Sequence, residues 1–147
     1  NYDDKNSHVI PALINRIHKA KINNYSSVEI WGTGKIRREF LHVEDMASAA
    51  IYIMNLSKSV IEKNTSHMCS HINVGFGVDI TIKELAITIS KIIGYEGKLK
   101  FDSSKPDGSP RKLLDNKVIK ALGWEPKINL LEGLQRTYND YKKQLNN

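Results

Sequence analysis

Apolar residues recur at helical spacing in five stretches of this sequence, and short alternating segments lie between them. This pattern predicts helices over residues 8–23, 43–57, 82–93, 115–122 and 129–145. It also predicts short strands or extended segments over residues 27–31, 39–42, 71–75, 98–101 and 112–114. Because the two kinds of element alternate irregularly, the fold class expected is a small mixed α/β domain and not a doubly wound sheet.

The helix over residues 82–93 has the clearest boundaries. Thr81 and Glu84 have the spacing of a capping box, and Gly94 is a normal C-terminal stop. Its inward face is expected to carry Ile82, Leu85, Ile89, Ile92 and Ile93.

The helix over residues 43–57 begins with two acids, Glu44 and Asp45, which suit the positive end of a helix dipole. Its inward residues are expected to be Met46, Ala49, Ala50, Ile53 and Leu56. Residues 58–70 are expected to form a polar loop.

Length and composition favour one compact domain, since 147 residues with 40% hydrophobic content can bury a working core. No apolar run approaches the roughly 18 residues of a membrane span. The single cysteine, Cys69, cannot form an internal disulfide, so a cytoplasmic location is expected. The opening residues 1–7 contain no initiator Met and no signal peptide, and they resemble the interior of a longer chain.

The net charge of +6 is concentrated in two blocks. Residues 1–42 hold 7 basic against 4 acidic side chains, and residues 97–127 hold 8 against 4. If the fold brings the blocks together, they form a cationic pocket for an anion such as a phosphate, whereas the alternative is a solvated lysine-rich surface. Nucleic acid is not the expected partner, because the basic residues are not interleaved with aromatic ones along one element.

Several short motifs do not reach a functional pattern. Gly32-x-Gly34 and Gly75-x-Gly77 lack the third glycine of a dinucleotide fingerprint, so turns are expected at both. Tyr138 and Lys142 have the Tyr-x-x-x-Lys spacing of a reductase, but Tyr138 belongs to the apolar stripe of the last helix. Three possible ligands at His67, Cys69 and His71 lack a fourth, so no metal site is expected.

A second group of residues has a coherent chemistry. His8 lies where a polar segment meets the first helix, and its side chain suits proton transfer. Arg16 follows two helical turns later on the same side. Trp31, Arg38 and Lys112 add an indole for stacking and two cations for phosphate oxygens. This mixture of side chains is what recognition of a nucleoside diphosphate requires.

Six segments together resemble the extended short-chain dehydrogenase/reductase family, in its GDP-keto-sugar epimerase/reductase branch. The matching segments are residues 7–13, 31–34, 38–47, 71–75, 105–115 and 122–124. The resemblance implies that residues 1–147 are the C-terminal substrate-binding domain of a longer two-domain enzyme. The Rossmann domain of the family, with its glycine-rich loop, its catalytic Ser, Tyr and Lys and its epimerising Cys, has no counterpart here. Cys69 does not match that cysteine, and Tyr138 and Lys142 do not match the catalytic pair.

The resemblance also assigns roles to single residues. His8 matches the family's general acid in epimerisation, which lies beside the nicotinamide. Arg16, Trp31, Arg38 and Lys112 match positions that line the GDP-sugar pocket, and Asp107 lies in the loop that closes over the pocket.

The implied activity is the NADP-dependent 3,5-epimerisation and 4-reduction of GDP-4-keto-6-deoxymannose to GDP-L-fucose. NADP would be bound mainly by the absent domain, so the isolated chain is expected to be inactive. The resemblance implies a homodimer for the longer enzyme, and the chain alone is expected to be monomeric. Two alternatives stay open: another GDP-keto sugar, such as a GDP-heptose derivative, or a non-enzymatic anion-binding module.

Overall fold

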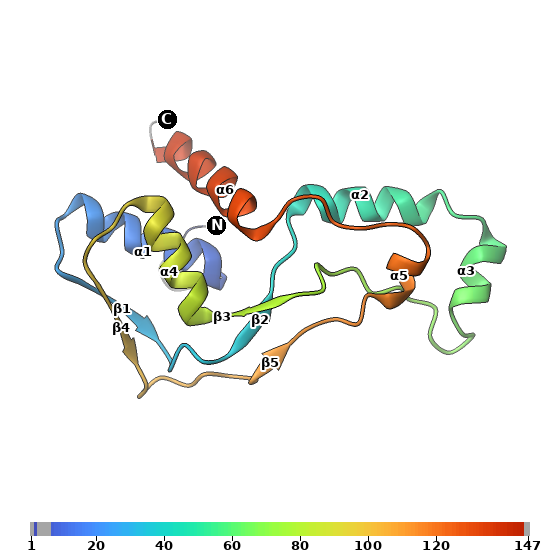
Figure 1. The fold of residues 1–147 in the computed structure, drawn as a ribbon, viewed down its shortest axis with the longest axis horizontal. Helices are drawn as coiled ribbons and strands as arrows, with labels where there is room; N and C mark the ends of the chain where they lie inside the picture. The colour runs from blue at the N-terminus through green and yellow to red at the C-terminus, as the bar shows by residue number, and fades with distance from the viewer. Residues whose placement is uncertain (1, 3–6, 146–147) are drawn as a thin grey trace. The chain divides into compact units, whose positions relative to one another are not determined.

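The protein is described by a computed structural model that covers residue 2 and residues 7–145. Of the polar opening, residues 1–7, only Tyr2 and Ser7 lie among the described residues. The elements follow the order α1 (Val9–Ile22), β1 (Ser27–Trp31), β2 (Arg37–Glu39), α2 (Val43–Met54), α3 (Lys58–Asn64), β3 (Asp79–Thr81), α4 (Ile82–Ile93), β4 (Lys98–Asp102), β5 (Arg111–Lys112), α5 (Lys117–Ala121) and α6 (Leu130–Leu145) (Figure 1). This mixed α/β architecture confirms the expected fold class.

The chain divides into two compact units, where composition had favoured one. Unit 1 comprises Asn1–Arg37, Ile80–Arg111 and Leu131–Asn147, and unit 2 comprises Arg38–Asp79 and Lys112–Leu130. The chain passes between the units inside β2, β3 and β5 and again at the start of α6. The three strands form a sheet in the order β3-β2-β5. Each unit has its own apolar cluster, and this is the physical reason for the division.

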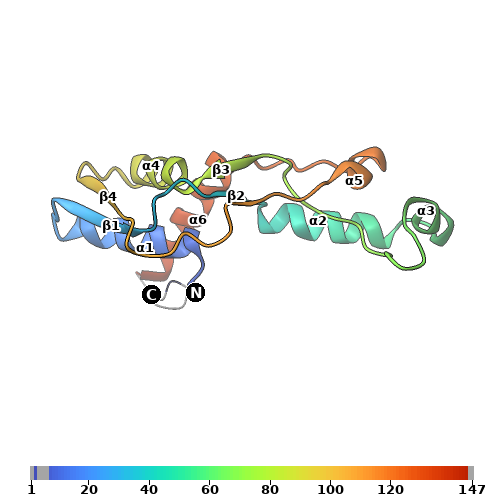
Figure 2. The same cartoon turned by 90° about the horizontal axis from the view of Figure 1, so that it is seen from below.

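In unit 1, a two-stranded parallel sheet lies beside α1 and α4 (Figures 1 and 2). Val28 pairs with Leu99 and Ile30 with Phe101 in the register of β1 and β4. The fully buried residues come mainly from the helices: Ile14, Ile17, Leu85 and Ile89. The capping box at Thr81 and Glu84 and the left-handed C-cap at Gly94 are both present, so the predicted boundaries of α4 are confirmed.

The last helix, α6, adds aromatic residues to the same core. Tyr138 and Tyr141 are buried, and the Tyr141 hydroxyl donates to Oδ1 of buried Asn15 at 2.8 Å. His18 Nδ1 and the Tyr138 hydroxyl are hydrogen-bonded at 3.0 Å. Tyr138 is therefore a core residue of unit 1.

Unit 2 is organised around a cluster of Ala49, Ile119 and Trp124. Ile72 and Val74, in the extended segment after α3, pack against this cluster, and Figure 2 shows that segment running along α2. The Tyr52 hydroxyl donates to the carbonyl of Leu122, and this bond joins α2 to the end of α5.

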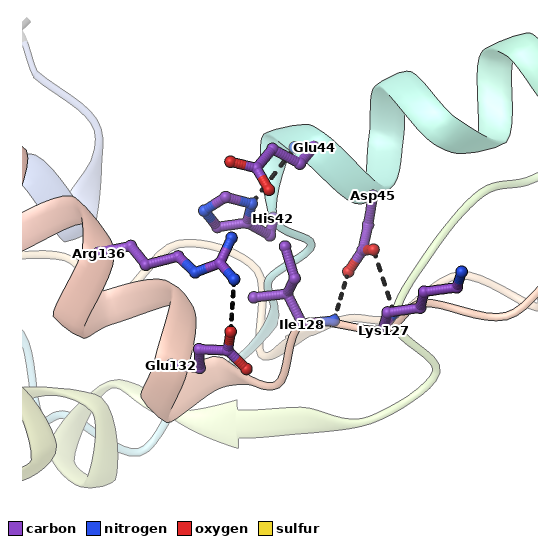
Figure 3. A network of polar contacts seen from close by, with 7 residues as sticks. All are labelled: His42, Glu44, Asp45, Lys127, Ile128, Glu132 and Arg136. Carbon is purple, nitrogen blue, oxygen red and sulfur yellow. Dashed lines mark hydrogen bonds and ion pairs between the residues drawn. The ribbon is translucent and has the colours of Figure 1, made fainter.

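Asp45 joins α2 to the segment that follows α5. Its side chain is 4% exposed, and its carboxylate accepts from the backbone N–H groups of Lys127 at 3.1 Å and Ile128 at 2.9 Å (Figure 3). His42 Nδ1 caps the same helix by accepting from the Glu44 N–H at 3.3 Å. Asp45 is therefore a buried anchor and not just a surface acid near the helix dipole.

Several sequence-based expectations differ from the structure: β3 was not predicted, and the strand expected at residues 112–114 lies at Arg111–Lys112. The strand expected at residues 39–42 lies at Arg37–Glu39, because Leu41 packs on the core of unit 2 and His42 caps α2. The segment 58–70 contains the helix α3. Residues 71–75 are not a strand, since no described strand pairs with them. On α2, Ala49 is buried as expected, but Met46 is 45% exposed and Ala50 is exposed.

Candidate functional site

His8 immediately precedes α1, where it adopts an extended backbone and leaves its side chain exposed. Its carbonyl accepts from the Ala12 N–H at 3.0 Å and so closes the first helical turn. The ring makes no capping bond to the helix, so it can take part in proton transfer without loss of local structure. Next to it, the buried hydroxyl of Ser7 has no hydrogen-bond partner among the described residues.

Trp31 ends β1 with its indole 55% exposed, and a cation from α1 lies over it. The guanidinium carbon of Arg16 is 4.9 Å from the ring centroid, and the ammonium of Lys105 is 5.9 Å from it. Cations at these distances are attracted by the π-face of an indole. The structure thus brings Arg16 and Trp31 together as expected, and it adds Lys105, which the sequence reasoning did not single out.

Asp107 fastens its loop to the turn that follows Trp31. One carboxylate oxygen accepts from the Thr33 N–H at 2.7 Å, and the other accepts from the Thr33 hydroxyl at 2.6 Å. The side-chain bond from Thr33, followed by the backbone bond, holds the pKa of Asp107 below its usual value. Gly32 has φ +86° and packs against this carboxylate, so a side chain there would displace it.

Arg38 and Lys112 belong to unit 2. They lie on β2 and β5, which are neighbours in the three-stranded sheet, so the two cations sit on adjacent strands. Arg38 is half-buried and Lys112 is exposed. The six site residues expected from the sequence therefore divide between the units, with His8, Arg16, Trp31 and Asp107 in unit 1.

Both glycine pairs use their turn amides inside the chain. The N–H of Thr33, between Gly32 and Gly34, donates to Asp107, and the N–H of Gly77 donates to Glu39 Oε1. An amide that already donates to a carboxylate does not bind a phosphate unless the carboxylate leaves. These turns are not pyrophosphate cradles, in agreement with the incomplete fingerprint.

The remaining motifs stay outside the site. Burial raises the pKa of Tyr138, the opposite of what a catalytic tyrosine needs, and the Lys142 ammonium lies 4.9 Å from the centroid of its ring. Cys69 Sγ lies 3.6 Å from His71 Nδ1. Among the described residues, no group of three or more His, Cys, Asp or Glu side chains could hold a metal ion.

No helix within residues 7–145 combines the length and the apolar character that crossing a membrane requires.

Three comparisons with known proteins, by family model, by sequence and by structure, point to the same family. The model of the NAD dependent epimerase/dehydratase family matches residues 1–75. GDP-L-fucose synthase of Escherichia coli (strain K12) is 55% identical over 138 residues, which are 94% of this chain and 43% of that protein. A solved GDP-6-OMe-4-keto-L-xylo-heptose reductase from C. jejuni has a TM-score of 0.87 and 37% identity, over 98% of this chain and 50% of that one.

A second solved structure is the GDP-mannoheptose C4 reductase MlghC from Campylobacter jejuni with NADP bound. Its TM-score is 0.80 at 35% identity, over 97% of this chain and 48% of that one. The chain spans about two fifths of the length of the curated relatives that it matches.

Proposed function

Since the chain belongs to the NAD dependent epimerase/dehydratase family, we propose that residues 1–147 are the GDP-sugar-binding, C-terminal part of an NADP-dependent GDP-4-keto-6-deoxymannose 3,5-epimerase/4-reductase. One observation carries the proposal. The exposed Trp31 indole lies under the guanidinium of Arg16, and the resemblance assigns both positions to the nucleotide-sugar pocket. An indole can stack on a base or ribose while a guanidinium forks onto phosphate oxygens.

The six site residues have separate proposed roles. Arg16, Arg38 and Lys112 supply positive charge for the diphosphate, and Trp31 supplies the stacking surface. Asp107 belongs to the loop that closes over the ligand. The free energy gained when the nucleotide binds offsets the entropy that is lost when the reacting sugar is held in one position.

His8 is the proposed proton donor. A 4-keto group acidifies the protons on C3 and C5 of the sugar, and a base removes them. His8 in its cationic form returns a proton on the opposite face, which inverts each centre. Its exposed ring at the start of α1 is compatible with contact to a sugar.

NADP is proposed to be held mainly by the part of the longer protein outside these residues. The two glycine turns of this chain give their amides to carboxylates, so they do not fit a dinucleotide, and His8 alone would face the nicotinamide. NADPH supplies the hydride that reduces the 4-keto group. We therefore expect the isolated chain to bind ligand without turnover.

The proposal extends to the cellular location and the oligomeric state. We propose that the longer protein is a cytoplasmic homodimer and that the isolated chain is monomeric. Neither nucleic acid nor a membrane is part of the proposed function.

The first test is calorimetric titration of the chain with GDP-mannose. Arg16→Ala and Arg38→Ala are each expected to weaken binding about 10- to 100-fold, because a charge-assisted bond to phosphate is lost. Arg136→Ala is the matched control, since Arg136 is paired with Glu132 at 2.6 Å on α6. Equal loss in all three variants would contradict the assigned site.

The same titration separates the alternatives. Titrating GDP, UDP and a short oligonucleotide at two salt concentrations tests for a non-enzymatic anion-binding module, which would show steep salt dependence and no preference for guanine. The similarity to a GDP-heptose reductase supports a second candidate substrate, another GDP-keto sugar. A panel of GDP-keto sugars with the longer protein distinguishes the two substrates.

An exposed apolar stripe on α2 supports the two-domain proposal. Spaced along one side of the helix are Val43 (74% exposed), Met46 (45%), Ala47, Ala50, Ile51 (61%) and Met54 (82%). The opposite side, with Ala49, packs on the core of unit 2. Soluble monomers rarely leave such a continuous apolar stripe uncovered.

The extended segment beside α2 adds a second indication. In the described part of the chain, the backbone N–H groups of Ile72, Asn73 and Val74 take part in no strand pairing or other backbone hydrogen bond. An extended segment with unpaired backbone N–H groups can pair with the edge strand of a sheet, and an apolar helix face can cover the face of that sheet. We propose that the dinucleotide-binding part of the longer protein occupies this surface, because the relatives are more than twice as long as their match to this chain.

Hydrogen exchange tests this docking. The amides of residues 72–74 are expected to exchange fast in the 147-residue chain and slowly in the longer protein. Ile51→Glu is expected to abolish that protection, whereas Ile22→Glu, at a residue of similar exposure (64%) in unit 1, should preserve it. Equally fast exchange in both proteins would refute the docking surface.

A further inference from the structure

The loop between β4 and β5 is tied down at both ends and in its middle. The Lys105 N–H donates to the carbonyl of Asp102 at 3.2 Å, and the Arg37 N–H donates to the carbonyl of Pro110 at 2.9 Å. Between these points, Asp107 uses both carboxylate oxygens on Thr33. All of these contacts lie within unit 1.

The bonds between Asp107 and Thr33 restrict the position of the Lys105 ammonium. Lys105 is two residues from Asp107, and its ammonium lies over the Trp31 indole. A free lysine side chain in a mobile loop loses rotamer entropy when it binds a ligand, in addition to the entropy lost when the loop becomes ordered. If the loop is already ordered in the ligand-free protein, its backbone entropy is not lost again when the ligand binds.

We infer that Asp107 is a positioning residue, which holds Lys105 over the Trp31 indole by fastening the loop of residues 103–110 to the turn of residues 32–34. The inference rests on the proposed function, in which Arg16, Trp31 and Lys105 together receive the nucleoside diphosphate. Lys105 then joins Arg16 and Trp31 as a group that binds the nucleoside diphosphate, and Asp107 acts through Lys105.

The chemistry of Asp107 favours this role over direct contact with the diphosphate. An aspartate carboxylate is ionised at neutral pH, and the two bonds from Thr33 lower the pKa of Asp107 further. An ionised carboxylate repels a diphosphate, whereas the Lys105 ammonium attracts it. Gly32 supports the fastening independently, since its positive φ and missing side chain leave the space that the carboxylate of Asp107 fills.

The experiment combines ligand-free NMR with GDP titration of the 147-residue chain. The variants are Asp107→Ala, Lys105→Ala and the double variant. Asp140→Ala is the charge-matched control, since Asp140 is an exposed residue of α6 that accepts a hydrogen bond from Gln144. Thr33→Ser retains the hydroxyl and should behave as the unmodified chain does, whereas Thr33→Val should resemble Asp107→Ala in part.

Without ligand, Asp107→Ala and Lys105→Ala are expected to shift the indole N–H signal of Trp31 in the same direction, and Asp140→Ala is expected to leave it unchanged. With GDP, each single variant should weaken binding about tenfold, and the double variant should also weaken it about tenfold. This non-additivity is the signature of a residue that acts through another.

Two results would overturn the inference: an unchanged Trp31 signal in Asp107→Ala, or a roughly hundredfold loss in the double variant. If the unmodified chain fails to bind GDP, the assignment of the ligand fails. The ligand-free spectra still decide whether Asp107 positions Lys105, so the two failures remain distinguishable.

Discussion

Replacing Asp45 with alanine is expected to lower the free energy of unfolding by roughly 2–4 kcal/mol, because two amide donors lose their acceptor at a buried site. The carboxylate is 4% exposed and accepts from the N–H groups of Lys127 and Ile128. Asp45→Asn keeps one acceptor oxygen and should lose about half as much. The measurement is urea denaturation followed by tryptophan fluorescence in a Trp31→Phe background.

The remaining tryptophan makes this measurement specific to unit 2. Trp124 is 6% exposed, lies in the core cluster of unit 2 and donates from its indole to Ser48 Oγ on α2 at 3.3 Å. The matched control is Glu44→Ala, which removes an exposed acid from the same helical turn. If Asp45→Ala lost no more stability than Glu44→Ala, the buried bonds of Asp45 to Lys127 and Ile128 would not stabilise unit 2, and its anchoring role would be wrong.

Replacing Leu85 with alanine is expected to lower the free energy of unfolding by roughly 2–5 kcal/mol. Leu85 is completely buried on α4, in the helix that packs against α1. Truncation removes apolar contacts and leaves a cavity that neighbouring helices fill incompletely. Since a whole domain has a free energy of unfolding of only about 5–15 kcal/mol, this single substitution removes a large fraction of that stability.

Hydrogen exchange of the α1 and α4 amides measures the loss in unit 1. Ile87→Ala is the control on the same helix, because Ile87 is 37% exposed and should cost less than about 1 kcal/mol. Similar exchange in the two variants would show that the inward face of α4 does not stabilise unit 1.

Leu85 and Asp45 also show which structural features can be predicted from the sequence and which cannot. Leu85 was expected to face inward, because a capped helix with one apolar stripe has one obvious way to bury it. Asp45 was expected to act on the helix dipole, and its buried bonds to residues 82 and 83 positions away were not foreseen. Helix periodicity is a local property of the sequence, whereas a contact across that separation depends on the path of the intervening chain.

The candidate site divides in the same way. The residue types and motifs were sufficient to select His8, Arg16, Trp31, Arg38 and Lys112, and the structure places Arg16 over Trp31. Lys105, whose role at the ligand is our proposal, was not selected because it is one of 8 basic residues in the block 97–127, although its place two residues before Asp107 was a usable signal. The resemblance places Asp107 in the loop that closes over the pocket, and its role in substrate binding stays a prediction, whereas the structure shows that both of its carboxylate oxygens accept from Thr33.

The helices other than α3, the mixed α/β class, the incomplete glycine fingerprints and the family could be predicted from the sequence, because each depends on local spacing or on short motifs. The tertiary structure alone decided that α2 has one packed and one exposed apolar side, that residues 71–75 have no strand partner among the described residues, and that Asp45 and Asp107 are anchors. The physical reason is that burial, strand pairing and hydrogen bonding need a partner, and these partners lie far along the chain or outside these residues.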